Sequence, residues 1–167
     1  MSALPKKLLS LLALCLIVAA FTTKPGSADF SGTWNLNESK SEMGQFANIV
    51  PKKIIVDQKV DSITMVKTSV GFNGEDVQQA ETLSFDGKEK QSTIPPGNSI
   101  RKASAKWTDD GKSLIISWNL QLDFNGQMTE IKGTETWTSG ADGKSLMVEN
   151  NSSSSFGDNK FKGYYEK

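Results

Sequence analysis

Apolar and polar residues alternate most strictly between Ser113 and Phe124. The apolar positions of this segment are Leu114, Ile116, Trp118, Leu120, Leu122 and Phe124, and only Ile115 interrupts the polar positions between them. A period of two places one face of a β-strand in the core and the other in water. The segment therefore predicts a half-buried strand.

Asn-Gly and Asp-Gly dipeptides separate the strand-like segments of the chain. They are Asn73-Gly74, Asp86-Gly87, Asp110-Gly111, Asn125-Gly126 and Asp142-Gly143. Such pairs favour two-residue type I′ turns, in which both residues take a positive φ. Five of them predict a meander of sequential antiparallel strands. Only Glu38 to Gly44 is expected to form a short turn of helix, because the rest of the chain after residue 28 has no long helical period.

A two-residue turn at Asn125-Gly126 sets the register of the two strands that flank it. Trp118 then pairs with Gly133, and the turn at Asp110-Gly111 pairs Trp118 with Ala103 on its other side. Small residues beside a large ring suit cross-strand packing. The same register gives the following further pairs: Leu120 with Ile131 and Arg101, Ile116 with Glu135 and Ala105, Leu114 with Trp137 and Trp107, and Phe124 with Gln127.

Three polar residues, Arg101, Thr129 and Glu135, fall on the inward face in this register. Buried polar groups need partners. Arg101 and Glu135 lie four residues apart along the sheet, about 13 Å at the rise of a strand, which leaves each free to meet a ligand. Alternatively they satisfy each other or reach water at the mouth of a barrel.

The remaining strands are expected at Phe30–Leu36, Lys52–Asp57, Ser62–Phe72, Asp76–Ser84, Lys88–Ile94, Gly143–Glu149 and Lys160–Tyr165. The whole predicts an all-β fold, an antiparallel up-and-down meander of about eight to ten strands closed into a barrel. Residues 62–94 do not show which face is inside, because a two-residue turn at Asn73-Gly74 places Val66 with Glu81 and Met65 with Thr82. Asn150 to Ser155, rich in serine, is expected to be a solvated loop.

Residues 1–28 have the pattern of a signal peptide. Lys6 and Lys7 precede an apolar segment, and Gly26-Ser27-Ala28 provides small residues for cleavage. Leu14, directly before Cys15, does not fit a lipoprotein signal, which needs a small residue there. We therefore expect an exported protein, periplasmic or secreted, with residues 29–167 as one domain and no stable membrane insertion after cleavage.

The composition of residues 29–167 argues against several kinds of functional site. There is no histidine, and Cys15 is the only cysteine, so we expect no metal site and no cofactor that depends on imidazole or thiolate. The chain has 19 acidic and 19 basic residues, three of the latter in residues 1–28, and the resulting mild negative charge argues against nucleic acid. The carboxylates near Glu135 do not converge on it, since Asp109 and Asp110 lie in a turn and Asp123 on the polar face, so we expect no enzyme.

The segment Phe30-Ser31-Gly32-Thr33-Trp34, the meander and the final Gly163-Tyr164-Tyr165-Glu166-Lys167 resemble the calycin group, that is, the lipocalin-like and fatty-acid-binding barrels. The segment also resembles the start of small exported bacterial proteins. The resemblance implies that Gly32 and Trp34 are structural and that Trp34 closes one end of the barrel. It also implies a basic cover for Trp34, from Lys160, Lys162 or Lys167.

Two functions remain open. The first is a binding module that holds a small apolar or amphipathic ligand, with candidate ligand-binding residues Arg101, Trp107, Trp118, Leu120, Thr129, Glu135 and Trp137, and Ala103 and Gly133 as structural residues beside Trp118. The second is an envelope or secreted interaction protein with a filled core that acts through surface loops, because tryptophans are common in cores and the small residues could merely accommodate Trp118. The sequence identifies no protein partner.

Overall fold

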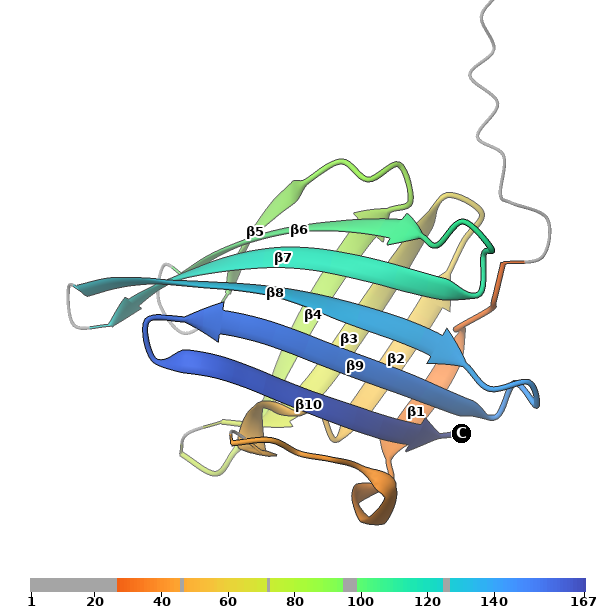
Figure 1. Ribbon diagram of the computed structural model, residues 1–167, viewed down its shortest axis with the longest axis horizontal. Helices are drawn as coiled ribbons and strands as arrows, with labels where there is room; N and C mark the ends of the chain where they lie inside the picture. The colour runs from red at the N-terminus through yellow and green to blue at the C-terminus, as the bar shows by residue number, and fades with distance from the viewer. Residues whose placement is uncertain (1–26, 46, 72, 95–98, 125–126) are drawn as a thin grey trace, which may run out of the picture.

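The computed structural model describes residues 27–45, 47–71, 73–94, 99–124 and 127–167 (Figure 1). The strands are β1 (Gly32–Leu36), β2 (Lys53–Gln58), β3 (Ser62–Val70), β4 (Asp76–Ser84), β5 (Lys90–Ile94), β6 (Ser99–Trp107), β7 (Ser113–Phe124), β8 (Gln127–Ser139), β9 (Ser145–Ser154) and β10 (Gly157–Glu166). Two short 3-10 helices, η1 (Glu38–Lys40) and η2 (Ala47–Ile49), lie between β1 and β2. The short helical turn expected after Glu38 is thus confirmed as η1.

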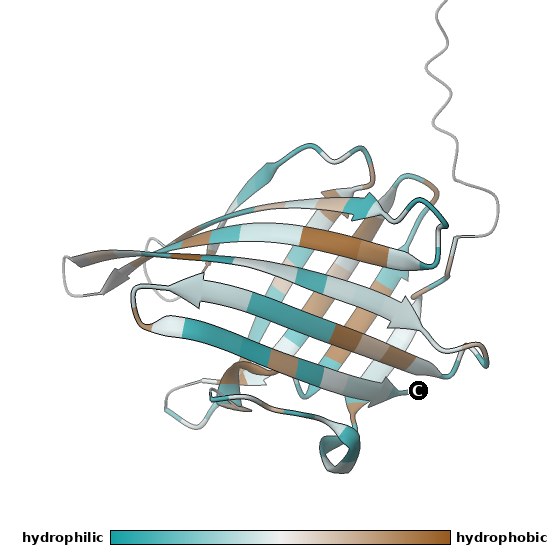
Figure 2. Ribbon diagram, in the orientation of Figure 1, coloured by the Kyte–Doolittle hydropathy of each residue, from teal (hydrophilic) through white to brown (hydrophobic). Residues whose placement is uncertain are grey.

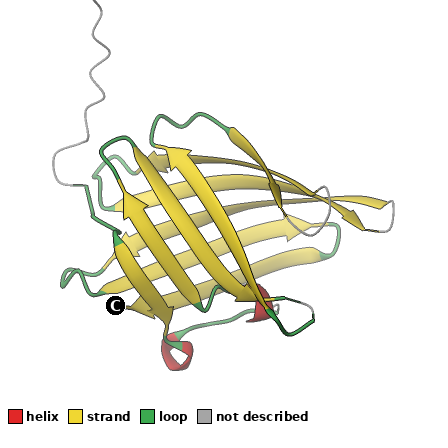
Figure 3. Ribbon diagram, turned by 180° about the vertical axis from the view of Figure 1, so that it is seen from behind, coloured by secondary structure: helices red, strands yellow, loops and turns green. Residues whose placement is uncertain are grey.

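All these strands belong to one sheet, in the order β4-β3-β2-β1-β10-β9-β8-β7-β6-β5. Strands that follow one another in the chain pair with each other, except β4 and β5, and β1 also pairs with β10. The sheet curls so that β1 to β4 form the wall opposite β6 to β10 (Figures 1 and 3), and β4 and β5 are its edges. The predicted all-β, antiparallel up-and-down meander is therefore confirmed, and it curls into a barrel whose edge strands β4 and β5 are not paired in the sheet.

The predicted register of the three central strands is also confirmed. Trp118 pairs with Ala103 on β6 and with Gly133 on β8. The pairing between β7 and β8 runs from Ser113 with Thr138 to Phe124 with Gln127. The strict alternation of β7 therefore places the side chains of these strands on the expected faces.

The hairpin turns differ from the predicted two-residue type. The N–H of Gly111 donates to the carbonyl of Thr108 three residues earlier, and the carboxylate of Asp110 accepts a hydrogen bond from the N–H of Lys112. The same side-chain contact, to the N–H two residues later, recurs at Asp86 and Asp142. Gly111 has φ +71°, a conformation that costs glycine little and other residues more. The predicted turn at Asn125-Gly126 lies outside the described residues.

The expected loop at Asn150 to Ser155 is wrong, because β9 continues to Ser154 and pairs with β10 along its whole length. Asn150 is only 4% exposed and points into the barrel. The four serines from Ser152 onward suggested a solvated loop, but the ladder to β10 satisfies the backbone polar groups of this segment. Hydrogen bonding between the strands outweighs the low strand propensity of asparagine and serine here.

The hydrophobic core lies mainly toward the end of the barrel that carries the β6–β7 and β8–β9 turns, called the plugged end below. Figure 2 shows the most apolar parts of β7 and β9 on this side. Trp34 is fully buried, its indole N–H donates to the carbonyl of Phe30 at 2.8 Å, and the Lys167 ammonium lies 4.6 Å from its ring centre. Trp34 is thus buried with a basic side chain over its ring, and of the three lysines that the resemblance offered this side chain is Lys167.

Candidate functional site

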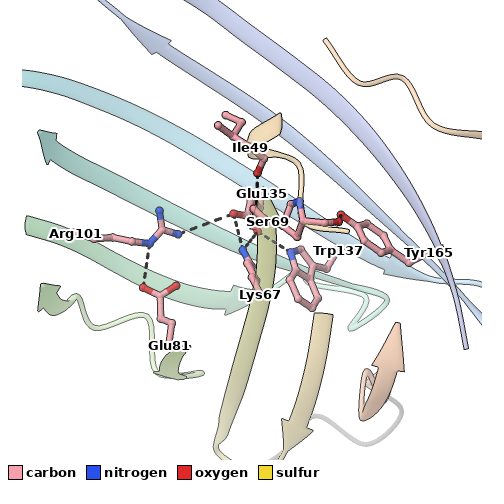
Figure 4. A network of polar contacts seen from close by, with 9 residues as sticks. Ile49, Lys67, Ser69, Glu81, Arg101, Glu135, Trp137 and Tyr165 are labelled. Carbon is pink, nitrogen blue, oxygen red and sulfur yellow. Dashed lines mark hydrogen bonds and ion pairs between the residues drawn. The ribbon is translucent and has the colours of Figure 1, made fainter. Parts of the chain in front are cut away.

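Beyond the plugged end, four charged side chains from four strands meet inside the barrel. They are Lys67 on β3, Glu81 on β4, Arg101 on β6 and Glu135 on β8 (Figure 4). Nζ of Lys67 lies 2.6 Å from Oε2 of Glu135, and Nε of Arg101 lies 3.1 Å from Oε1 of Glu81. Nη2 of Arg101 lies 4.0 Å from Oε1 of Glu135, which joins the two pairs. We call these four residues the interior charge network.

The interior charge network is removed from water. Its side chains are 14%, 7%, 8% and 10% exposed for Lys67, Glu81, Arg101 and Glu135 respectively. Charges with so little hydration need close partners of opposite sign, and the network supplies them with two positive and two negative groups. The network is therefore electrically balanced within itself.

Glu135 is the centre of the interior charge network. Burial alone would raise the pKa of its carboxyl, but the nearby Lys67 ammonium and Arg101 guanidinium outweigh this effect and hold the pKa below its usual value. The indole N–H of Trp137 also donates to Oε2 of Glu135, at 3.0 Å. Glu135 is therefore a carboxylate in the folded protein, with its oxygens engaged by the protein itself.

The aromatic rings of two tryptophans cover the cations of this network. The Arg101 guanidinium carbon lies 4.9 Å from the ring centre of Trp118, and Nζ of Lys67 lies 5.5 Å from that of Trp137. A cation close to a tryptophan ring is attracted by the negative face of the ring. These contacts hold both long side chains in place inside the barrel.

The structure thus places Arg101 and Glu135 closer together than strand spacing indicated. The register does set them four residues apart along the sheet, as Arg101 pairs with Leu120 and Leu120 with Ile131. Because the sheet is curved and the arginine side chain is long, the Arg101 guanidinium comes within 4.0 Å of the Glu135 carboxylate. Of the alternatives that the sequence left open, the structure shows local partners for both Arg101 and Glu135.

The remaining candidate ligand-binding residues fall into two groups. Trp107 and Trp137 pack at the plugged end, where Trp107 stacks on Phe30 with ring centres 5.6 Å apart and Trp137 meets Phe30 edge-on at 5.9 Å. Leu120 and Thr129 lie further toward the β7–β8 turn, and Thr129 is 9% exposed. Trp118 lies between the groups and is partly buried against the core.

One inward-facing row of residues runs across four strands beside Trp118. Trp118 pairs with Gly133, Gly133 with Ser152, and Ser152 with Asn159 on β10. The indole ring lies over Gly133, since a Cβ atom built there would stand 2.4 Å from Cζ2 of Trp118 and 3.0 Å from Cβ of Ser152. Ala103 is 1% exposed on the other side of Trp118. We call Trp118, Gly133, Ser152 and Asn159 the Trp118 row.

The Trp118 row contains buried polar atoms that no described residue satisfies. They are Nε1 of Trp118 and both Oδ1 and Nδ2 of Asn159. Asn159 is 7% exposed. Buried polar atoms nearly always have a hydrogen-bond partner, so atoms like these indicate a place where water or a ligand binds.

Two hollows accompany the site. One, of about 180 Å³, lies between the sheet edges and is lined by Ala80, Glu81, Thr82, Lys90 and Ser92. Glu81 therefore links this hollow to the interior charge network. The other, of about 600 Å³, lies on the outer face of β6 to β10, because residues such as Ser104, Ser117 and Thr134 alternate with the inward-facing ones.

Sequence reasoning missed Lys67, Glu81 and Asn159. The β3–β4 hairpin pairs Met65 with Glu81, one residue away from the predicted register, because Gly71 and Glu75 close a longer turn than Asn73-Gly74 alone. A slip of one residue exchanges the two faces of a strand. With the observed register Ile63, Met65 and Leu83 face inward, and so do the two charges. Asn159 was missed because the last strand was expected to begin at Lys160, whereas β10 begins at Gly157.

The described residues show neither of two common functional features. They contain no group of three or more histidine, cysteine, aspartate or glutamate residues that could hold a metal ion. No helix among them is long and apolar enough to cross a membrane.

Comparison with known proteins does not assign the chain to a family. No family model and no curated protein sequence matches it. Among solved structures it is similar to the zebrafish ileal bile-acid-binding protein complexed with cholic acid, with a TM-score of 0.48 and 16% sequence identity. The similarity covers 83% of this chain and 98% of that one.

Proposed function

We propose that this protein is a non-catalytic binding module that holds a small apolar or amphipathic molecule inside its barrel, and that it acts after export of the chain. The observation that carries the proposal is the Trp118 row, in which buried polar atoms of Trp118 and Asn159 lack partners among the described residues. Apolar walls with a few placed polar groups are the usual lining of a small-molecule site.

The contrast between the two sections of the barrel supports this function. At the plugged end Phe30, Trp107 and Trp137 pack closely and serve the core. A core that serves stability alone gains little from buried charge, since apolar residues of similar volume are as good or better. The interior charge network and the Trp118 row therefore indicate a section built for binding.

A second candidate function is that of an interaction protein that acts through its surface. Met128, after the β7–β8 turn, and Phe156, in the β9–β10 turn, are 61% and 74% exposed. Large apolar side chains on hairpin tips favour contact with another surface. In this function the interior needs no ligand.

Native mass spectrometry of the protein purified from its own host separates the two functions. A retained small molecule supports the binding module, and its mature mass also reports whether residues 1–28 are removed. Titration with small apolar compounds should then shift tryptophan fluorescence in a saturable way, and Trp118→Ala should abolish the shift. Lys112→Ala is the control, because Lys112 is exposed in the β6–β7 turn. A bare protein mass and flat titrations would contradict the proposal.

A further inference from the structure

The chemistry of the barrel interior also bears on the kind of ligand. Each charge of the interior charge network already has a partner of opposite sign within the protein. A carboxylate ligand would have to compete with Glu135 for Lys67, or with Glu81 for Arg101. Either competition would leave a buried protein carboxylate without its partner, which is costly.

The unsatisfied groups are, in contrast, all uncharged. The indole N–H of Trp118 can only donate, whereas the amide of Asn159 offers one acceptor oxygen and two donor hydrogens. Nothing in the Trp118 row supplies a free charge to neutralise an ionised head group.

The two residues belong to the same inward-facing row of the barrel. Trp118 extends over Gly133 toward Ser152, and Ser152 is the direct strand partner of Asn159. The hydroxyl of Ser152 is engaged with the carbonyl of Asn159 at 3.3 Å and with the amide nitrogen of Asn150 at 3.4 Å. The polar atoms left for a guest are therefore those of Trp118 and Asn159.

We propose that the Trp118 row is a head-group subsite, and that it takes an uncharged group that both donates and accepts hydrogen bonds, such as a primary amide or an alcohol, in preference to a carboxylate. This inference rests on the proposed function. A carbonyl or hydroxyl oxygen accepts from the Trp118 indole, and the Asn159 amide pairs with the other side of the head group. The apolar remainder of the ligand lies against the inward-facing apolar side chains.

Isothermal titration calorimetry with dodecanamide, dodecan-1-ol and dodecanoic acid tests the inference on the mature protein, at a pH where the acid is ionised. The three compounds share one apolar chain and differ in the head group. We expect the amide and the alcohol to bind about tenfold or more tightly than the acid, as one or two net hydrogen bonds imply.

Two substitutions then locate the subsite. Trp118→Phe keeps a ring over Gly133 and removes the N–H, and Asn159→Leu keeps the volume and removes both polar atoms. Each should reduce the preference for the amide over the acid several-fold. Asn151→Leu is the matched control, because Asn151 neighbours this row on β9 but is exposed on the outer face. Thermal denaturation of each variant checks that it is folded.

The outcomes separate the two proposals. If none of the three compounds binds, the proposed function is overturned for this class of ligand. If the acid binds as tightly as the amide, the inference fails and the binding module stands. If the preference exists but survives both Trp118→Phe and Asn159→Leu, the Trp118 row is not the subsite.

Discussion

Nζ of Lys67 lies 2.6 Å from Oε2 of Glu135, which joins β3 to β8 across the interior of the barrel. These strands are not neighbours in the sheet, as β2, β1, β10 and β9 separate them. A contact of this kind ties opposite walls together, as Figure 4 shows. It also fixes the positions of a positive and a negative charge inside the barrel.

Removal of one partner from this pair should destabilise the protein strongly. Glu135→Leu leaves Lys67 buried without its carboxylate and the Trp137 indole without its acceptor. We expect a loss of about 3–5 kcal/mol in the free energy of unfolding. Urea denaturation followed by tryptophan fluorescence measures it.

The double variant Lys67→Met with Glu135→Leu distinguishes pairing from packing. It removes both charges and keeps apolar volume, so most of the lost stability should return. Lys162→Met is the surface control, because Lys162 pairs with Glu149 at side-chain exposures of 30% and 40%, and an ion pair open to water contributes little to stability. A double variant as unstable as Glu135→Leu would contradict this account.

The interior charge network also predicts a dependence of stability on acid. The pKa of Glu135 is lower in the folded protein than its ordinary value of 4.5, so the unfolded chain takes up the proton first as pH falls. The stabilisation by Glu135 is therefore fully present above pH 4.5 and is lost as pH falls through the folded pKa.

Comparison with Glu135→Gln isolates this effect. The wild-type protein should be more stable than Glu135→Gln near neutral pH, and the difference should shrink below about pH 4.5. Acidic residues outside the interior charge network contribute equally to both proteins and cancel in the difference. A constant difference from neutral to acid pH would show that Glu135 does not titrate in this way.

The sequence was most informative where one face of a strand is apolar throughout. In β7 the alternation set both the strand and its register, because a slip there would expose Leu114, Ile116 and Trp118 together. β3 and β4 carry the charged residues Lys67 and Glu81 on the inward face. Neither face of these strands is apolar throughout, so a shift of register by one residue would not have exposed a whole row of apolar side chains, as it would in β7. The length of the β3–β4 turn then decided the register.

The site was less accessible to sequence reasoning than the fold for a related reason. Arg101 and Glu135 could be recognised as inward polar residues from the β6–β8 register alone. Their partners Glu81 and Lys67 come from strands on the other wall, and only closure of the barrel brings these strands near. Asn159 reaches the interior because β9 and β10 extend beyond their predicted ends.

Lys167 and Trp34 provide a third test, at the plugged end. The ammonium of Lys167 lies 4.6 Å from the ring centre of Trp34. Lys167→Met keeps most of the apolar stem and removes the charge, so we expect a loss of about 0.5–1 kcal/mol in the free energy of unfolding, as for an exposed cation–π contact. Lys160→Met, an exposed position on β10, the strand that directly precedes Lys167, should leave stability unchanged. Equal effects of the two substitutions would argue against the cover.

Gly133 is the position where the packing of Trp118 can be tested most directly. A methyl group at residue 133 would stand 2.4 Å from Cζ2 and 2.6 Å from Cε2 of Trp118, so the ring must move. We expect Gly133→Ala to reduce the free energy of unfolding by about 1–3 kcal/mol, as overpacking does in a closely packed interior.

In Gly133→Ala combined with Trp118→Leu the clash is absent, so the double variant should be more stable than the sum of the single effects indicates. The double-mutant cycle, measured by chemical denaturation, should give a coupling of at least about 1 kcal/mol. Additive effects would mean that the ring does not occupy the space over Gly133, and the Trp118 row would lose its geometric basis.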